Sequence, residues 1–294
     1  MAKPTFLDRL QTGEILISDG ATGTNLQARG LTRGMPAEKW VLDNPQQIVQ
    51  LHSDFIEAGS DIILTCTFGG TELRLAHSDL ADQAEEINTR AVELARQAAQ
   101  GTEVFIAGSM GPTGQMLKPL GPLEEQDAVT AYANQARFLT QAGVDFLVIE
   151  TQFDLAEAVT ALQGARSVSN LPIVLSFSYD RGTRTMMGVR PAQVAKQFSD
   201  SGVVALGINC GRALDENLEA LKQLRESTSL PIWFKPNAGL PKLDEEGNPT
   251  YEITPGIVGS QVSSWLENGA QIVGGCCGNS PAHLRAIALA ARAK

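Results

Sequence analysis

Short apolar runs alternate with helix-periodic segments along the whole chain, and this alternation is the feature that most constrains the fold. The runs are rich in β-branched residues, and the helical segments open at a capping residue or a proline. Eight pairs of this kind fill the 294 residues. The strands are expected to end at Asp19, Thr67, Ser109, Glu150, Phe177, Asn209, Lys235 and Cys276, and the helices to span 45–58, 81–100, 123–142, 155–168, 191–201, 214–227, 254–268 and 281–291.

Eight strand–helix units without a break in composition predict a closed (β/α)8 barrel, a TIM barrel of the α/β class, with residues 1–294 as a single domain. The alternative is an open, doubly wound sheet with helices on both faces, which one sequence leaves open. Two loops exceed what a minimal barrel needs: 27–44 after the first strand and 240–253 after the seventh. The second carries an acidic turn signal at 244–249 and predicts a surface hairpin.

Composition narrows the class of ligand. The formal net charge of -10 argues against a nucleic-acid or anionic-membrane partner, because both require a basic surface. The N-terminal residues contain no apolar signal core, and no run of about 18 apolar residues occurs. These features predict a cytoplasmic protein that acts on a small molecule.

Three of the four cysteines follow predicted strands. Two are adjacent in Gly274-Gly275-Cys276-Cys277-Gly278, and Cys210 ends the sixth run. Active groups of barrels lie at the C-terminal ends of strands, and only the seventh strand separates the sixth from the eighth, so the three sulfurs can converge. Three thiolates with one open position describe a catalytic zinc site. The neighbouring glycines permit backbone shapes that let both adjacent side chains face one ion.

Two other interpretations of these cysteines stay open. Free cysteine packs well as a small buried hydrophobe. Cys276 and Cys277 could instead form a vicinal disulfide, although a reducing cytosol disfavours that bond. Cys66 lies between Thr65 and Thr67 at the second strand, and we expect it to be packed rather than to bind metal.

The charge of such a centre indicates its chemistry. Three thiolates make the site net negative, so it is a poorer Lewis acid for generating hydroxide than a site with neutral histidine ligands. A second thiol suits the open position better, because the thiol loses its proton on binding and the thiolate is the reactive nucleophile. The cysteine pattern therefore predicts activation of a thiol substrate.

Six stretches agree in order with one known family. They are Asp19-Gly20-Ala21-Thr22-Gly23-Thr24, Leu64-Thr65-Cys66-Thr67-Phe68-Gly69-Gly70, Gly108-Ser109-Met110-Gly111-Pro112, Gly207-Ile208-Asn209-Cys210-Gly211, Lys235-Pro236-Asn237-Ala238-Gly239 and the Cys276-Cys277 motif. Together they resemble the homocysteine S-methyltransferases, and among these the homocysteine-binding barrel of the cobalamin-dependent methionine synthases. The resemblance covers essentially the whole chain.

The resemblance implies that homocysteine is activated for methylation to methionine, with Cys210, Cys276 and Cys277 as Zn²⁺ ligands. Betaine-using relatives carry a tyrosine next to the glutamate that ends strand four, whereas this chain has Glu150-Thr151. It therefore looks more like the cobalamin-dependent branch. The methyl donor would be methylcobalamin or another methylcorrinoid, supplied by a corrinoid-binding domain or protein.

Polar residues near the same rim predict a cradle for an amino-acid substrate. Strand one neighbours strand eight in a closed ring, so Asp19 and the turn after it should border the zinc. Backbone N–H groups of the turn can bind a carboxylate, and the Asp19 side chain can bind an ammonium, unless it merely caps the turn. The turn residues concerned are Gly20, Ala21, Thr22, Gly23 and Thr24.

Glu150 ends an otherwise apolar strand, where a carboxylate is costly unless it faces a cleft or is paired. A buried pair with an arginine is the alternative to a role in the cleft. The resemblance places ammonium recognition near Glu150 and includes Ser109 among the substrate-binding residues. Asn237 could fill the open zinc position before substrate arrives, or it could be a turn residue before Gly239.

Two further functions are compatible with parts of the pattern. Gly274-Gly275 after strand eight resembles the glycine turn of phosphate-binding barrel enzymes, although the cysteines argue against that function. A non-catalytic module that binds zinc or a thiol for delivery to a partner would also need the three cysteines.

Overall fold

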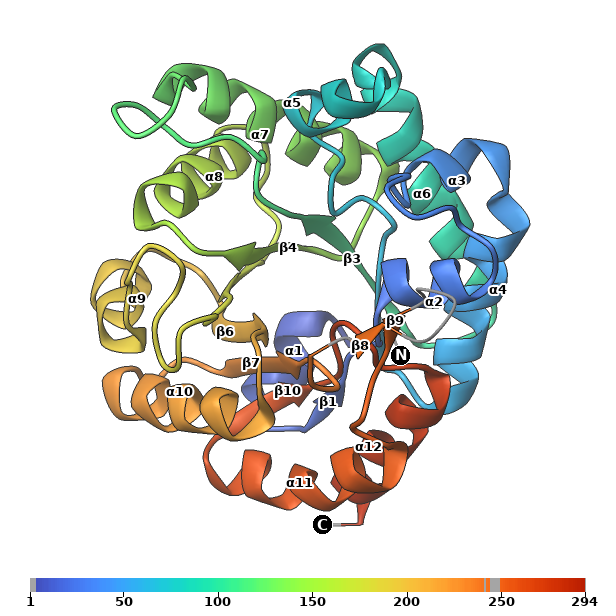
Figure 1. Ribbon diagram of the computed structural model, residues 1–294, viewed down its shortest axis with the longest axis vertical. Coiled ribbons are helices and arrows are strands. Elements are labelled where there is room, and N and C mark those ends of the chain that lie inside the picture. Colours follow the sequence, from blue (N-terminus) through green and yellow to red (C-terminus); the bar gives the residue numbers. More distant parts are fainter. Residues whose placement is uncertain (1–3, 241, 244–248, 294) are drawn as a thin grey trace.

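Eight parallel strands form a barrel surrounded by helices in the structure, a computed structural model that describes residues 4–240, 242–243 and 249–293 (Figure 1). The strand order is β1-β10-β7-β6-β5-β4-β3-β2. The predicted TIM barrel is confirmed. The strands are β1 (Leu16–Ile17), β2 (Ile62–Leu64), β3 (Phe105–Met110), β4 (Phe146–Gln152), β5 (Ile173–Phe177), β6 (Ala205–Cys210), β7 (Ile232–Pro236) and β10 (Ala270–Val273).

The ring closes between β1 and β2, where aspartate side chains supplement a very short ladder. Ser18 and Ile62 form an isolated parallel bridge. The Asp61 carboxylate accepts the Ile17 N–H at 2.9 Å, while the Asp61 N–H donates to the Ile17 carbonyl at 2.7 Å. One carboxylate oxygen of Asp19 accepts the Leu64 N–H at 2.8 Å. These bonds join the two ends of the strand order, so the open doubly wound alternative is wrong.

The outer layer consists of the eight predicted helices, whose starts follow from local signals. Proline occupies the first turn of four of them, where its missing N–H costs nothing, and a glycine in the left-handed conformation ends two of the eight. The helices are α4 (Pro45–Ala58), α6 (Ala84–Ala98), α7 (Glu125–Ala142), α8 (Leu155–Val168), α9 (Pro191–Phe198), α10 (Leu214–Ser227), α11 (Pro255–Glu267) and α12 (Pro281–Arg292).

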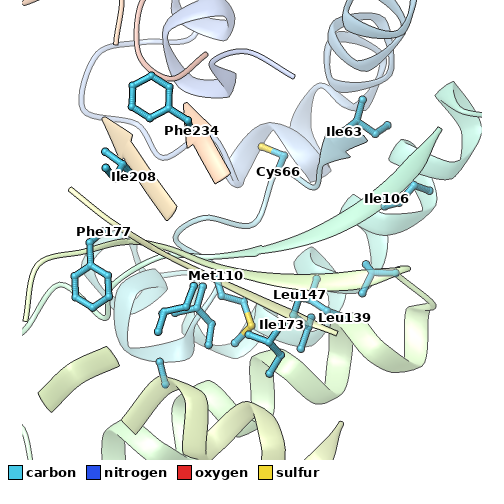
Figure 2. Close-up of a cluster of buried hydrophobic side chains, with 14 of the residues drawn as sticks. Ile63, Cys66, Ile106, Met110, Leu139, Leu147, Ile173, Phe177, Ile208 and Phe234 are labelled. Atoms are coloured by element: carbon cyan, nitrogen blue, oxygen red, sulfur yellow. The ribbon is translucent and has the colours of Figure 1, made fainter. Parts of the chain in front are cut away.

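Strand alternation divides the apolar residues into two packed groups. One face of each strand packs against the helices, as Figure 2 shows for Ile106, Leu147 and Phe234 together with Leu139 of α7. The other face fills the barrel interior. That interior cluster comprises Phe6, Leu10, Leu16, Ile62, Leu64, Phe105, Ala107, Phe146, Val148, Val174, Ala205, Trp233 and Ile272.

A short N-terminal helix, α1 (Phe6–Gln11), closes the lower end of the barrel. Its Phe6 ring stacks on Phe146 with centroids 3.8 Å apart and meets Phe105 edge-on at 6.0 Å. Thr5 and Asp8 form a capping box that fixes the start of this helix. Because α1 closes the barrel at the N-terminal ends of the strands, the barrel interior opens at their C-terminal ends, which are called the upper end below.

The same alternation places polar side chains above the apolar interior. Ser109, Glu150 and Lys235 each lie two residues beyond an inward-facing core residue, so they also face inward. Ser176, two residues after Val174 on β5, and Asn209, four residues after Ala205 on β6, face inward by the same alternation. The upper interior is thus a buried polar layer, on which the functional site is built.

Several short elements decorate the upper rim. They are α2 (Thr22–Ala28), α3 (Lys39–Asp43), α5 (Glu72–Leu75), two 3-10 turns at Ala76–Ser78 and Ala81–Gln83, and an antiparallel hairpin of β8 (Lys242–Leu243) and β9 (Pro249–Thr250). The predicted hairpin is therefore present, while its acidic tip at 244–248 lies outside the described residues. Across the described ranges, no helix is both long and apolar enough to cross a membrane.

Candidate metal centre and substrate site

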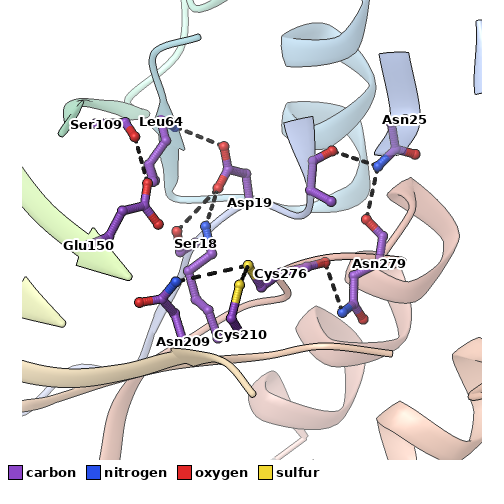
Figure 3. A network of polar contacts seen from close by, with 12 residues as sticks. Ser18, Asp19, Asn25, Leu64, Ser109, Glu150, Asn209, Cys210, Cys276 and Asn279 are labelled. Carbon is purple, nitrogen blue, oxygen red and sulfur yellow. Dashed lines mark hydrogen bonds and ion pairs between the residues drawn. The ribbon is translucent and has the colours of Figure 1, made fainter. Parts of the chain in front are cut away.

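Three cysteine sulfurs meet at the upper end of the barrel. Cys210 ends β6, and Cys276 and Cys277 follow β10; their Sγ atoms all lie within 4.8 Å of one another (Figure 3 shows Cys210 and Cys276). The Cys210 and Cys276 sulfurs are 3.1 Å apart, and all four cysteines are free thiols. Tetrahedral zinc with Zn–S bonds of about 2.3 Å separates its sulfurs by about 3.8 Å. The three sulfurs thus lie within reach of one shared ion, with Cys210 and Cys276 closer together than bound zinc would hold them.

The ionisation of the three thiols also suits a cation. Hydrogen bonds to Cys276 and Cys277, together with burial, raise the pKa of the Cys210 thiol well above its usual value. A hydrogen bond with Cys210 lowers the pKa of Cys276, but the hydrogen bond with Cys277 and burial raise it more, so that this pKa rises to about 12. Hydrogen bonds from the other two thiols lower the pKa of Cys277. A metal ligand must be a thiolate, so binding of a divalent cation would displace protons from the cluster.

Backbone hydrogen bonds fix the loop that carries the cysteine pair. The Cys276 N–H donates to the Pro236 carbonyl at 2.9 Å, and the Cys277 carbonyl accepts the Ala238 N–H at 2.9 Å. On the other side, the Gly275 N–H donates to the Asp19 carbonyl at 3.1 Å. A Cβ on Gly274 would lie 2.8 Å from the carbonyl oxygens of Ser18 and Asp19, so only glycine permits this close approach.

Cys210 reaches the cluster because its backbone leaves the strand conformation. Leu206 and Ile208 point outward on β6, so regular alternation would also turn Cys210 outward. Instead Cys210 has φ +61, a left-handed conformation that a non-glycine residue adopts at a cost of about 1–3 kcal/mol. The Asn217 amide, which donates to the Cys210 carbonyl at 2.7 Å, helps to hold this turn.

A cavity of about 680 Å³ opens above the cluster, within the size range of small-molecule sites. Besides the three cysteines, Lys235 and residues of loops after β1 and β2 form its wall. Asp19 and Asn237 do not line it. The predicted residues that do are Gly20, Ala21, Thr22, Gly23, Thr24, Ser109, Glu150, Cys210, Cys276 and Cys277.

Glu150 is a buried carboxyl in the cavity wall, with 7% of its surface exposed. Burial raises its pKa to about 7, although the positive charge of Lys235 opposes that shift. The Ser109 hydroxyl donates to one carboxyl oxygen at 2.5 Å (Figure 3). At neutral pH, Glu150 is thus poised to change its protonation state when a charged ligand arrives.

Asp19 is held by the protein itself. The Lys235 ammonium lies 2.6 Å from one carboxylate oxygen, and both side chains are buried. The second oxygen accepts the Leu64 N–H at the β1–β2 seam. A contact of Asp19 with the substrate ammonium stays a prediction, and any such contact would have to be made beside Lys235.

The sequence predicts that Asn237 could fill the open zinc position, whereas Cys66 is expected to be packed outside the metal site. The Asn237 amide donates to the Gly211 carbonyl at 2.7 Å, and its buried Oδ1 has no hydrogen-bond partner among the described residues. Such an unsatisfied oxygen is what a weak metal ligand would offer, so this role stays a prediction. Cys66 packs in the outer hydrophobic cluster, outside the three-sulfur group, and burial raises its pKa.

Two polar residues of the site and one aromatic neighbour are not predicted from the sequence. Lys235 and Asn209 end apolar runs, which is the signal that identified Glu150, yet neither was given a role. Tyr251 follows the hairpin and packs against Gly278, where a Cβ would lie 2.4 Å from the ring. Burial and the nearby cysteines raise the Tyr251 pKa to about 12.

Comparison with known proteins gives concordant results. A family model described as homocysteine S-methyltransferase matches residues 16–291. The methionine synthases of Mycobacterium tuberculosis and Mycobacterium leprae are each 30% identical over 293 residues, covering 94% of this chain and 24% of each relative. The chain thus spans about a quarter of the length of these curated relatives.

Solved structures agree with the sequence comparison. The metallated form of the homocysteine methyltransferase MmuM from Escherichia coli superposes with a TM-score of 0.80 at 26% identity, covering 94% of this chain and 96% of that one. The carboxyl transferase domain of Rhizobium etli pyruvate carboxylase, at 14% identity and a TM-score of 0.56 over 95% of this chain and 47% of that one, shares the fold alone.

Proposed function

The chain belongs to the homocysteine S-methyltransferase family, and we propose that it methylates the sulfur of homocysteine to give methionine at a zinc centre held by Cys210, Cys276 and Cys277. The observation that carries the proposal is the convergence of three cysteine sulfurs in the wall of a cavity that also presents a buried carboxyl. Family membership favours this function over a phosphate-binding barrel and over a non-catalytic thiol-binding module. The three cysteine thiols of the proposed centre would need a reducing compartment, such as the cytoplasm, to stay reduced.

Each part of the site has a defined task in this proposal. A bound zinc ion would supply an open position at which a thiol is deprotonated and remains nucleophilic at neutral pH. Glu150 receives the substrate ammonium. The substrate carboxylate faces N–H groups at the start of α2, after Ala21, whose own N–H donates to the Asn279 carbonyl. The substrate sulfur then forms a bond to the methyl carbon, while the electrons of the broken bond remain with the donor.

The methyl donor in this proposal is a methylcorrinoid carried by another domain or protein. Large apolar side chains on three rim loops favour a bulky donor: Phe68 is 40%, Leu120 67% and Met186 55% exposed. They lie on the loops that follow β2, β3 and β5. The residue after Glu150 is threonine rather than the tyrosine of betaine-using relatives, in agreement with this choice.

A donor assay tests the function. Zinc-loaded protein is incubated with homocysteine and, in parallel, with methylcobalamin, betaine or S-methylmethionine, and methionine is quantified. We expect methionine with methylcobalamin alone. Methionine from either of the other donors would overturn the corrinoid assignment but keep the enzyme, whereas no methionine from any donor would favour a thiol-binding module.

Proton release on homocysteine binding tests the roles of the sulfur and of Glu150 together. At pH 7 we expect about one proton from the thiol, which is largely protonated when free. A further half proton, roughly, should leave Glu150, because its pKa is about 7 and pairing with an ammonium favours the ionised form. Calorimetric heats in buffers of different ionisation enthalpy measure the total.

The Glu150→Gln variant and homoserine separate the two contributions. The variant should release only the thiol proton and bind homocysteine about tenfold to hundredfold more weakly, since a charge-assisted contact of about 1.5–3 kcal/mol is lost. Homoserine should release only the Glu150 proton. Because binding releases protons, affinity should rise with pH, more steeply below pH 7 in the wild type than in the variant. Unchanged proton release in the variant would remove Glu150 from the cradle.

A further inference from the structure

Asn209 lies in the buried polar layer and contacts two strands and the loop that follows β10. Its Oδ1 accepts the Thr151 N–H of β4 at 2.9 Å and the Ser176 hydroxyl of β5 at 2.6 Å. Its Nδ2 lies 2.6 Å from the Thr151 hydroxyl. The same Nδ2 lies 3.9 Å from the Cys276 sulfur, a contact that Figure 3 shows. The side chain is fully buried, so each of these contacts replaces water.

The orientation of the Asn209 amide follows from its partners. A backbone N–H can only donate, so the amide atom that faces the Thr151 N–H must be the oxygen. The nitrogen therefore faces the other way, toward the Thr151 hydroxyl and the Cys276 sulfur. A thiolate can only accept, which makes Cys276 a suitable partner for the second N–H.

The Thr151 contact stabilises an irregularity that orients Glu150. The β4–β5 register shifts between Ile149 and Gln152, and within that interval Thr151 has φ +60. A bulge of this kind frees a backbone N–H from the ladder and redirects a side chain. Here the freed N–H is the one that Asn209 accepts, and Glu150 faces the cavity just before it.

Asn209 also precedes Cys210, whose φ of +61 turns that sulfur into the cluster. Of the three non-glycine residues with positive φ in the described chain, two are thus adjacent to Asn209: one by hydrogen bond and one by sequence. Left-handed residues persist only where their surroundings over-determine them. The Asn209 side-chain amide therefore connects the left-handed residue of β4, Thr151, to the left-handed residue of β6, Cys210.

On the premise of the proposed function, we propose that Asn209 is a positioning residue that couples the ammonium cradle to the metal-binding cysteines. Its acceptor side holds the bulge that aims Glu150. Its donor side provides an N–H···S hydrogen bond that fixes the direction of the Cys276 sulfur and lowers its electron density. Groups that orient a metal ligand in this way typically contribute tenfold to hundredfold to metal affinity.

The Asn209→Leu variant tests this coupling, because leucine has a similar shape but neither donor nor acceptor. Ser176→Ala is the matched control: it removes one hydrogen bond to the same Oδ1 and leaves Nδ2 untouched. Asn209→Ala, which adds neither charge nor bulk, gives the same comparison if leucine is not accommodated. Zinc affinity is measured by competition with a chelator, and cobalt-substituted protein reports the thiolate-to-metal absorption band.

We expect both Asn209 variants to bind zinc about tenfold to hundredfold more weakly and to shift the cobalt band to lower energy, since a sulfur without its hydrogen bond is a stronger donor. Zinc-saturated variants should also bind homocysteine more weakly, because Glu150 is no longer held. Ser176→Ala should change none of these readouts.

A purely structural Asn209 would give a different pattern, with lower thermal stability but an unchanged cobalt band and zinc affinity. That pattern would overturn the coupling and leave the proposed function standing. A wild-type protein that bound no zinc would overturn both.

Discussion

Alanine at Cys276 or Cys277 is expected to abolish zinc binding and methionine formation together, and Cys210→Ala to do the same. Each substitution leaves two thiolates, and no histidine, aspartate or glutamate of the described residues joins the cysteine cluster to replace the lost sulfur. Structural zinc–thiolate sites bind with about 10–16 kcal/mol, so losing one of three sulfurs should lower affinity by several orders of magnitude. Metal analysis and the methionine assay measure the two losses.

Cys66→Ala is the matched control for these variants. Cys66 is the fourth free thiol, but it packs in the outer hydrophobic cluster. Its alanine variant should lose some stability from the lost packing and keep zinc content near one per chain. Stoichiometric zinc in a Cys276→Ala, Cys277→Ala double variant would contradict the proposed centre outright.

Lys235→Met is expected to destabilise the protein by about 3–5 kcal/mol, because it leaves the Asp19 carboxylate buried without its cation. Methionine keeps most of the lysine volume, so the loss reports charge rather than packing. The ammonium also lies near Glu150, whose pKa should rise further once Lys235 is gone. Urea unfolding of metal-free protein, followed at constant pH, measures the change in free energy of unfolding.

The double variant Lys235→Met, Asp19→Asn should recover much of that stability, since no uncompensated charge then remains. Asparagine still offers an oxygen to the Leu64 N–H, so the β1–β2 seam is preserved. If the double variant were as unstable as the sum of the two single variants, the pair would not interact, and Lys235 would stabilise the barrel through its stem alone.

Local signals predicted the barrel well because each unit carries its own periodicity and caps. The bounds of α4, α8 and α10 agree with the sequence-based ranges for that reason. The predictions for β2 and β10 extended three residues too far, to Thr67 and Cys276. For β2, the β-branched Thr65 and Thr67 continue the strand signal into the loop. The α1 plug was missed, since six residues show too little periodicity.

The cysteine cluster was predictable because residue type and strand position together imply convergence. Lys235 and Asn209 were not given roles because those roles depend on partners from other strands. Asn209 of β6 binds Thr151 of β4 across the intervening β5, and Lys235 pairs with Asp19, which is 216 residues earlier in the sequence. The sequence also gives no local signal for the left-handed conformations of Thr151 and Cys210, because neither residue is glycine.

Closure of the ring has a consequence for biosynthesis. Leu16 near the start of the chain pairs with Ile272 near its end, and the cysteine pair follows directly on that last strand. During translation, β1 can pair with β10 only after residues up to Val273 have been synthesised. By contrast, β3 to β6 can pair with strands that are synthesised shortly before or after them. Cys210 likewise has no partner cysteines for a metal site until Cys276 and Cys277 have been synthesised. In the proposed function, metal uptake would therefore mark the molecules in which the barrel has closed, and a half-closed barrel would carry none.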